Sequence, residues 1–243
     1  MKRPIFVILA EGKLGLETSK TAASTIRYLP DRVAAVIDSR HAGLTTHDVL
    51  GTGGGIPVVS SLAEALAVDG ESPQALLVGV ANRGGTIPTE HRPVLLEAVG
   101  AGLDVWSGLH ERLADDPDLV ARARQRSVRL VDLRDPPADL PVGTGLAFGT
   151  DAFRVLTVGT DCNVGKMTAS LEIRRARQER GVDARVAGTG QSGIVIDGAG
   201  SPVDAVVSDF VSGAAVRITL EAAEGADVVL VEGQGSLFHP GYS

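Results

Sequence analysis

The chain has 243 residues, of which 44% are hydrophobic and 22% are charged, and its formal net charge is −7. This composition excludes a disordered chain, and the length suffices for one large or two medium-sized domains with cores of their own. The acidic balance argues against nucleic acid and anionic membranes as partners, because both select a basic surface. No apolar run approaches the ~18 residues of a membrane span, so we expect a cytoplasmic protein that acts on a small molecule.

The chain contains one cysteine, Cys162, which excludes an intramolecular disulfide framework. His41, His47 and His91 do not stand at metal-ligand spacing from it, so we expect no structural zinc site. The single cysteine is consistent with a reducing compartment.

The first 140 residues alternate short, β-rich apolar runs with helical patterns, as the βαβ units of a parallel sheet do. The expected strands cover residues 5–10, 33–38, 57–59, 75–80, 103–106 and 128–133, and the expected helices cover residues 19–28, 61–68, 90–101 and 117–125. These six strands predict a Rossmann-like N-terminal domain over residues 1–140. The turn-rich stretch over residues 141–150 is the expected linker.

Residues 151–243 continue the alternation and predict a second parallel α/β domain. Strands are expected over residues 153–158, near 184–188 and over 228–232, and a helix over residues 166–180. On that helix Ala169, Ile173 and Ala176 fall on one face, and Gly181 ends it.

The segment between the strand at 153–158 and the following helix has the form of a phosphate-binding loop. Its glycines let backbone N–H groups turn toward phosphate oxygens, and the helix presents its positive N-terminal end. Lys166 is the only lysine beyond residue 20, and its compact ammonium neutralises phosphate charge. The second domain is therefore predicted to be P-loop NTPase-like. The candidate cofactor-binding residues are Gly159, Thr160, Asp161, Cys162, Asn163, Val164, Gly165, Lys166, Met167 and Thr168.

Two positions of this loop depart from the G-x-x-x-x-G-K-[ST] pattern. Thr160 occupies the first glycine position, and Met167 follows the lysine, where a hydroxyl usually holds Mg²⁺. A thioether is a poor ligand for a hard cation, so either Thr168 takes over this role or the metal is absent. Phosphate binding is therefore better supported than Mg²⁺-dependent phosphoryl transfer, and an ordinary glycine-rich turn is the remaining alternative.

A second feature typical of phosphate-loop proteins lies where the expected strand at 228–232 ends. Glu232 closes this strand and is followed by Gly233, Gln234 and Gly235. An acid at the carboxyl edge of the same parallel sheet can hold a cation or a substrate amine beside the loop.

These motifs together resemble a known family, the one that includes bacterial D-glutamate N-acetyltransferase. The resemblance rests on GTDCNVGKMT at 159–168, TGQSG at 189–193, SDFVSG at 208–213 and EGQGSLFHP at 232–240, with GGGIP at 53–57, RGG at 83–85 and SGLH at 107–110 in the first domain. The loop alone also resembles dethiobiotin synthetase. The family resemblance implies a Rossmann-like domain, then a P-loop domain, and acetyl transfer from acetyl-CoA to a D-amino acid. Family members continue past the last motif, so we expect the second domain to be incomplete at its C-terminus.

The motifs also supply candidate site residues. The catalytic candidates are His239, Asp209 and Glu232, and the substrate-binding candidates are Arg83, His110 and Gln191. Either histidine serves as a general base near neutral pH or is a packed or hydrogen-bonding side chain. Arg83 either holds a substrate carboxylate or is a solvated loop residue. Cys162 either carries an acyl group at the helix N-terminus or packs within the loop.

Three functional classes remain open at this point. The first is an N-acetyltransferase that moves an acetyl group from acetyl-CoA to the amine of an amino acid such as D-glutamate. The second is an ATP-dependent kinase or ligase of the dethiobiotin synthetase type, which uses ATP with Mg²⁺. The third is a non-catalytic nucleotide-binding module. The expected partners are a small-molecule amino acid and further copies of the chain in a homo-oligomer, with no nucleic acid and no membrane.

Overall fold

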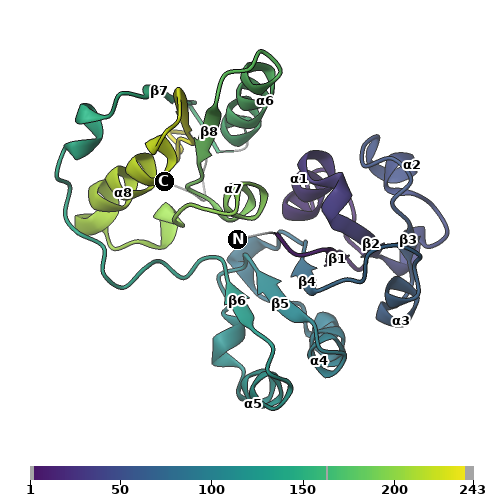
Figure 1. The fold of residues 1–243 in the computed structure, drawn as a ribbon. Helices are drawn as coiled ribbons and strands as arrows, with labels where there is room; N and C mark the ends of the chain where they lie inside the picture. The colour runs from purple at the N-terminus through teal and green to yellow at the C-terminus, as the bar shows by residue number, and fades with distance from the viewer. Residues whose placement is uncertain (1–2, 163, 239–243) are drawn as a thin grey trace. The chain divides into compact units, whose positions relative to one another are not determined.

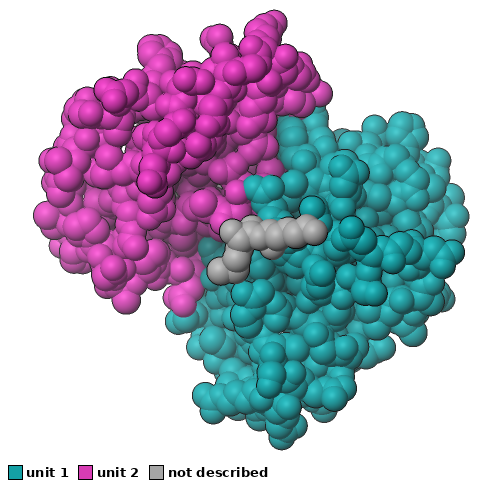
Figure 2. All heavy atoms as spheres, viewed as in Figure 1, with its two compact units in different colours: residues 1–133 teal, residues 134–243 magenta. Residues whose placement is uncertain are grey.

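The computed structural model describes residues 3–162 and 164–238. It divides the chain into two compact units, which Figure 2 shows in different colours. Unit 1 is Met1–Leu133 and unit 2 is Arg134–Ser243. Each unit has a parallel sheet of its own.

Unit 1 is built on a six-stranded sheet in which all neighbouring strands are parallel. Its strands are β1 (Phe6–Leu9), β2 (Val33–Ile37), β3 (Val58–Val59), β4 (Ala75–Val78), β5 (Asp104–Ser107) and β6 (Leu130–Asp132). The order β3-β2-β1-β4-β5-β6 is that of the Rossmann fold, which confirms the predicted fold class. The order reverses between β1 and β4, and open sheets of this kind bind ligands at such a reversal.

The helices of unit 1 are α1 (Lys20–Tyr28), α2 (Thr46–Leu50), α3 (Leu62–Leu66), α4 (Arg92–Gly100) and α5 (Pro117–Arg126). The sequence pattern predicted all of them except α2. That helix has five residues and begins with a capping box between Thr45 and Asp48, so it is too short for a helical period to appear. No helix in the described part of the chain has the length and apolar character that crossing a bilayer requires.

Helices cover both faces of the unit 1 sheet (Figure 1). One hydrophobic cluster joins alternate residues of β1 to the helices α3, α4 and α5. On the other face α1 lies so close that a Cβ at Gly79 would be 2.6 Å from Ile8 Cγ2 and 2.7 Å from Ala22 Cβ. All four residues of β1 are buried, as expected of a central parallel strand with both faces covered.

Unit 2 has a three-stranded parallel sheet in the order β7-β9-β8. Its strands are β7 (Phe153–Leu156), β8 (Ala184–Ala187) and β9 (Val228–Val231), and its helices are α6 (Lys166–Gln178), α7 (Gln191–Asp197) and α8 (Val211–Ala223). The expected strands and the helix after the loop are present. The sequence pattern did not predict α7 and α8, because glycine and β-branched residues weaken the helical pattern of both segments.

The core of unit 2 lies around the strands β8 and β9. Val229 and Ala187 pack against Ile218 of α8, while Leu171 of α6 is fully buried. The chain moves from β7 to β8 and then back to β9, so right-handed connections place α6 and α8 on opposite faces of the sheet. The edge strand β7 leaves Phe153 and Leu156 largely exposed.

One glycine of α8 allows a close approach between this helix and the segment 141–143. A Cβ built on Gly213 would lie only 1.6 Å from Pro141 O. Alanine is the better helix former by about 1 kcal/mol, so the close approach and not helix propensity explains the glycine.

We expect Gly213→Ala to destabilise unit 2, because the segment at Pro141 has to move. The cost of inserting a methyl group into a filled space is about 1–3 kcal/mol, and denaturant unfolding followed by circular dichroism measures it. Gly100→Ala at the end of α4 is the control, since the nearest atom to its Cβ would be Arg122 Nη1 at 3.9 Å. Equal stability of the two variants would contradict the contact.

Candidate functional site

The three strands of unit 2 end at one edge of the sheet, and the segments that follow them carry most of the candidate residues. Leu156 of β7 and Ala187 of β8 are both in register with Val231 of β9. The segments 157–165, 188–190 and 232–237 therefore begin at the same edge. This is the carboxyl edge, where parallel sheets bind ligands.

Lys166 begins α6 directly after Gly165, whose φ of 96° lies in the region that favours glycine. Its Nζ donates hydrogen bonds to Asp161 O at 2.6 Å and to Gly235 O at 3.2 Å. The ammonium group therefore lies between the phosphate loop and the segment that follows β9. From this position a lysine reaches phosphate oxygens held by the loop.

Two glycines beside Lys166 have no room for a side chain. A Cβ at Gly159 would lie 2.5 Å from Val164 Cγ2, and a Cβ at Gly233 would lie 1.9 Å from Thr157 O. The position of the Gly233 Cβ is also 3.6 Å from Lys166 Cδ, so the lysine stem passes beside this glycine. The sequence motif contained Gly233, but only the structure shows that it permits this close approach.

The segment after β9 is fastened to the phosphate loop by hydrogen bonds. Ser236 Oγ donates to Asp161 Oδ1 at 2.6 Å, and Leu237 N donates to Thr160 O at 3.0 Å. The same Asp161 oxygen accepts the N–H of Cys162 at 2.7 Å. The Asp161 carboxylate therefore shapes the loop, and Cys162 is half-buried within it.

Glu232 directly follows β9 and turns its carboxylate into the unit, where 7% of the residue is exposed. Its Oε2 accepts the N–H of Thr189 at 3.1 Å, and Thr189 Oγ1 donates to Glu232 O at 2.9 Å. A Cβ at Gly193 would lie 2.6 Å from the same Oε2, so α7 leaves little space around the carboxylate.

Burial raises the pKa of Glu232 above the usual value of a glutamate. The N–H groups of Thr189 and Gly190 and the charge of Lys166 favour the ionised form, but they do not outweigh the loss of solvent. Glu232 is therefore a stronger base than an exposed carboxylate, and it lies within electrostatic reach of the loop lysine.

The first turn of α6 determines which side-chain oxygens could bind a metal ion beside the loop. Met167 follows the lysine, and the next hydroxyl along the chain is that of Thr168. The Thr168 hydroxyl has no hydrogen-bond partner in the described residues. Ser170 Oγ is engaged at 3.0 Å from Thr157 Oγ1. Within residues 3–162 and 164–238, no three His, Cys, Asp or Glu side chains gather closely enough to hold an ion.

Asp209 and Gln191 lie at the starts of helices in unit 2. Asp209 is exposed in the 3₁₀ turn Ser208–Phe210, which leads into α8. Gln191 is the first residue of α7, and its Oε1 accepts a hydrogen bond from Arg134 Nη2 at 3.0 Å. Their roles in catalysis and substrate binding remain predictions. Two further candidates, Asn163 and His239, lie outside the described residues.

Arg83 and His110 follow the neighbouring strands β4 and β5 of unit 1. Arg83 begins the 3₁₀ turn Arg83–Gly85, and the N–H of Glu111 donates to Gly85 O at 2.9 Å. A Cβ at Gly85 would lie 2.4 Å from His110 Cδ2, so the exposed histidine lies directly against the turn. The structure thus brings these two motifs together at the carboxyl edge of the unit 1 sheet.

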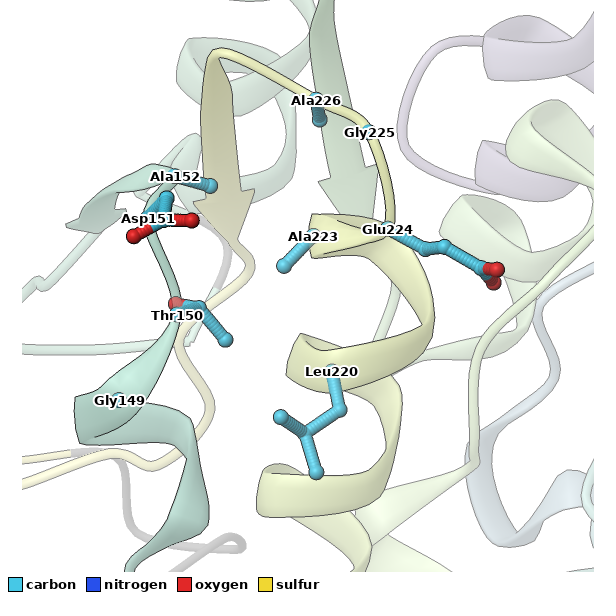
Figure 3. Close-up of a pocket in the computed structure, with 9 residues that line it drawn as sticks. All are labelled: Gly149, Thr150, Asp151, Ala152, Leu220, Ala223, Glu224, Gly225 and Ala226. Carbon is cyan, nitrogen blue, oxygen red and sulfur yellow. The ribbon is translucent and has the colours of Figure 1, made fainter.

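A shallow hollow of about 280 Å³ in unit 2 is not part of the phosphate-loop site. It is lined by residues 149–152, which precede β7, and by Leu220 and residues 223–226, which precede β9 (Figure 3). These positions lie at the amino edge of the sheet, opposite the loop. The Glu224 side chain extends away from the other labelled residues in Figure 3, so the hollow offers no convergent charges.

Comparison with known protein families finds two matching models. One is described as a Rossmann-like domain of unknown function (DUF1611_N) and matches residues 39–136. The other is described as a P-loop domain of unknown function (DUF1611_C) and matches residues 141–243. The two descriptions agree with the folds of unit 1 and unit 2.

Two curated relatives carry the name D-glutamate N-acetyltransferase. The protein from Tritonibacter scottomollicae is 43% identical over 183 residues, which are 75% of this chain and 53% of the relative. The protein from a Pseudoalteromonas species is 38% identical over 170 residues, which are 70% of this chain and 50% of the relative. The aligned part of this chain therefore spans about half the length of these relatives.

A solved structure is similar over almost the whole chain. It is the crystal structure of a DUF1611 family protein from Anabaena variabilis, with a TM-score of 0.89 and 38% sequence identity. The similarity covers 99% of this chain and 69% of that protein. With both domain models matched in order and this relative covered over more than two thirds of its length, the chain belongs to the DUF1611 family.

Proposed function

We propose that the chain takes part in N-acetyl transfer from acetyl-CoA to the amine of an amino acid such as D-glutamate. The observation that carries this proposal is the phosphate loop with Lys166 at its centre, in a chain 43% and 38% identical to two proteins named D-glutamate N-acetyltransferase. Coenzyme A carries a diphosphate and a further phosphate on its ribose, so it needs an anion site of this kind.

The residues around the loop fit a phosphate group. Lys166 Nζ donates to two backbone carbonyls, and a phosphate oxygen is a stronger acceptor than either. The missing side chains at Gly159 and Gly233 let the loop, the segment after β9 and the lysine stem pack closely together. Lys166 and the loop backbone would hold the phosphates of acetyl-CoA, which supplies the activated acetyl group.

We assign to Glu232 the removal of a proton from the amine of the substrate. An amino acid arrives as an ammonium ion and has to lose a proton before its nitrogen is nucleophilic. The burial that raises the pKa of Glu232 also strengthens it as a proton acceptor. Asp209 and His239 are the other candidates for this step, and Cys162 is not required for a direct transfer.

The alternative function is an ATP-dependent kinase or ligase. The strand, loop and helix at 153–178 favour it as much as they favour coenzyme A, since both ligands bind through phosphates. Mg²⁺ separates the two functions. Met167 stands where the usual hydroxyl ligand would be, and Thr168 is one residue further around the helix, a rotation of about 100°.

The proposed reaction is tested by following free thiol release from acetyl-CoA with a panel of D- and L-amino acids, D-glutamate first. We expect release with at least one amino acid and no loss of coenzyme A affinity when a chelator removes Mg²⁺. If no amino acid elicits thiol release while Mg-ATP is turned over with one of them, the acetyl transfer proposal is wrong and the ATP-dependent function replaces it.

Lys166→Met is expected to weaken coenzyme A binding about tenfold to a hundredfold. The variant keeps the aliphatic stem beside Gly233 but removes a charge-assisted phosphate contact, which contributes roughly 1.5–3 kcal/mol. Isothermal titration with coenzyme A measures the change. Arg177→Met, on an exposed residue about three turns along the same helix, should bind as the unmodified chain does. An unchanged affinity in Lys166→Met would exclude this lysine from the phosphate site.

Glu232→Gln should abolish acetyl transfer while leaving coenzyme A binding intact.

The same variant should change how stability depends on pH. Burial disfavours the ionised carboxylate of Glu232, so this charge lowers the stability of the folded chain at pH values above its raised pKa. That cost disappears as the pH falls toward the ordinary value of 4.5. The stability of Glu232→Gln relative to the unmodified chain should therefore decrease as the pH is lowered from neutral toward 4.5. Urea unfolding at several pH values, with the exposed Glu224→Gln as control, measures this trend, and a trend of opposite sign would contradict the burial effect.

A further inference from the structure

Unit 1 has a cluster of polar side chains at the point where its strand order reverses. The loop after β1 carries Lys13, and the turn after β4 is preceded by Asn82. Lys13 Nζ donates to Asn82 Oδ1, while Asn82 Nδ2 donates to Thr86 O at 3.0 Å and holds the turn. These bonds join the two loops across the switch point, which is where open α/β sheets bind ligands.

The loop differs from a dinucleotide-binding loop at its first glycine, which is Ala10 here, while Gly12 and Gly15 keep the other two positions. In dinucleotide-binding folds an acid after the second strand binds the ribose, and the first loop reads G-x-G-x-x-G. Here Asp38 is fully buried and accepts hydrogen bonds from Gly12 N at 2.9 Å, Arg40 N at 3.2 Å and His41 Nδ1 at 2.7 Å. Its carboxylate holds the loop and is not available to a ribose.

The same loop offers one charge of each sign. Glu11 Oε2 accepts the N–H of Ser39 at 2.9 Å and Oε1 accepts the Ser39 hydroxyl, so both oxygens hold the loop after β2 and each keeps one further lone pair. The Lys13 ammonium has three donors, of which Asn82 takes one and no other described residue takes a second. An acid and a cation two residues apart match a zwitterion, whereas Glu11 would repel a phosphate group.

A buried histidine borders this loop with one nitrogen unused. His91 is fully buried at the start of α4, and its Nε2 lies 3.4 Å from Glu11 O. Its Nδ1 is buried and has no hydrogen-bond partner in the described residues. When Nε2 donates to the carbonyl, it holds the backbone of the loop at Glu11, and Nδ1 is an acceptor that lacks a donor among the described residues.

We propose that this loop is the amino-acid site of unit 1, with Lys13 on a carboxylate and Glu11 on the ammonium of an acidic amino acid. The proposal rests on the proposed acetyl transfer, for which it names the residues that bind the acceptor. The turn at Arg83 lies next to Asn82 in the chain, and His110 lies against that turn. Two of the candidates predicted for substrate binding, Arg83 and His110, thus belong to segments next to this loop in unit 1.

The test is isothermal titration of the 243-residue chain with D-glutamate in the presence of saturating coenzyme A, which cannot donate an acetyl group. We expect Lys13→Gln to weaken D-glutamate binding by tenfold or more, as the loss of a charge-assisted contact does. Lys13→Arg should keep most of the affinity, because it keeps the charge. Glu11→Gln should weaken D-glutamate more than it weakens glutarate, which has both carboxylates but no ammonium.

Lys166→Met is the matched control, since it removes a lysine charge from the other unit. It should lose affinity for coenzyme A but bind D-glutamate alone as the unmodified chain does, whereas Lys13→Gln should show the reverse. Thermal unfolding of each variant identifies any loss of fold, and in that case Lys13→Arg and Glu11→Gln decide the result.

Two results would overturn the site. One is D-glutamate affinity that is unchanged in Lys13→Gln and Glu11→Gln, and the other is no binding of D-glutamate to the unmodified chain with or without coenzyme A. Acetyl transfer with an unchanged KM in Lys13→Gln would reject the site and leave the proposed function standing. Lys13-dependent binding without any thiol release would reject the function and leave the site.

Discussion

The phosphate loop depends on the contact between Gly233 and the carbonyl of Thr157, where a Cβ would lie 1.9 Å from the oxygen. Thr157 N donates to Val231 O at 3.1 Å, and Gly233 N donates to Thr157 Oγ1 at 3.3 Å. The segments that follow β7 and β9 are therefore in direct contact with each other. Glu232 directly precedes Gly233 in the chain, and the stem of Lys166 passes beside Gly233. A carboxylate and an ammonium group from distant parts of the sequence are thereby held at one edge of the sheet.

Much of this arrangement was predictable, because local patterns specify it. The alternation of apolar strands and helices predicted both sheets, and the glycine-containing loop before a helix predicted the P-loop fold of unit 2. The helices α2, α7 and α8 were not predictable from periodicity, since α2 and α7 are short and α7 and α8 are rich in small or β-branched residues. The burial of Glu232 could not be predicted from the sequence either, because it results from the packing of α7 against the end of β9. The bond between Lys13 and Asn82 joins residues 69 positions apart, and no local pattern indicates such a pair.

The burial of Glu232 has opposite effects on stability and on chemistry. The surrounding N–H groups of Thr189 and Gly190 satisfy the ionised carboxylate in part, but the loss of solvent dominates and raises its pKa. A protein selected for stability alone would place an uncharged side chain at this position. Functional sites commonly retain such destabilising groups, because the same burial makes the carboxylate a stronger base.

The net charge of −7 bears on how anionic ligands bind to this chain. Coenzyme A and glutamate are both negatively charged, so the overall field of the protein opposes their approach. At physiological ionic strength this repulsion is screened beyond about 8 Å, and affinity therefore has to come from contacts at short range. Each proposed site has one lysine and a glycine-containing loop, with backbone N–H groups or polar side chains close by. Two of the four lysines, Lys13 and Lys166, stand in the two loops where an anion would bind, which is consistent with this requirement.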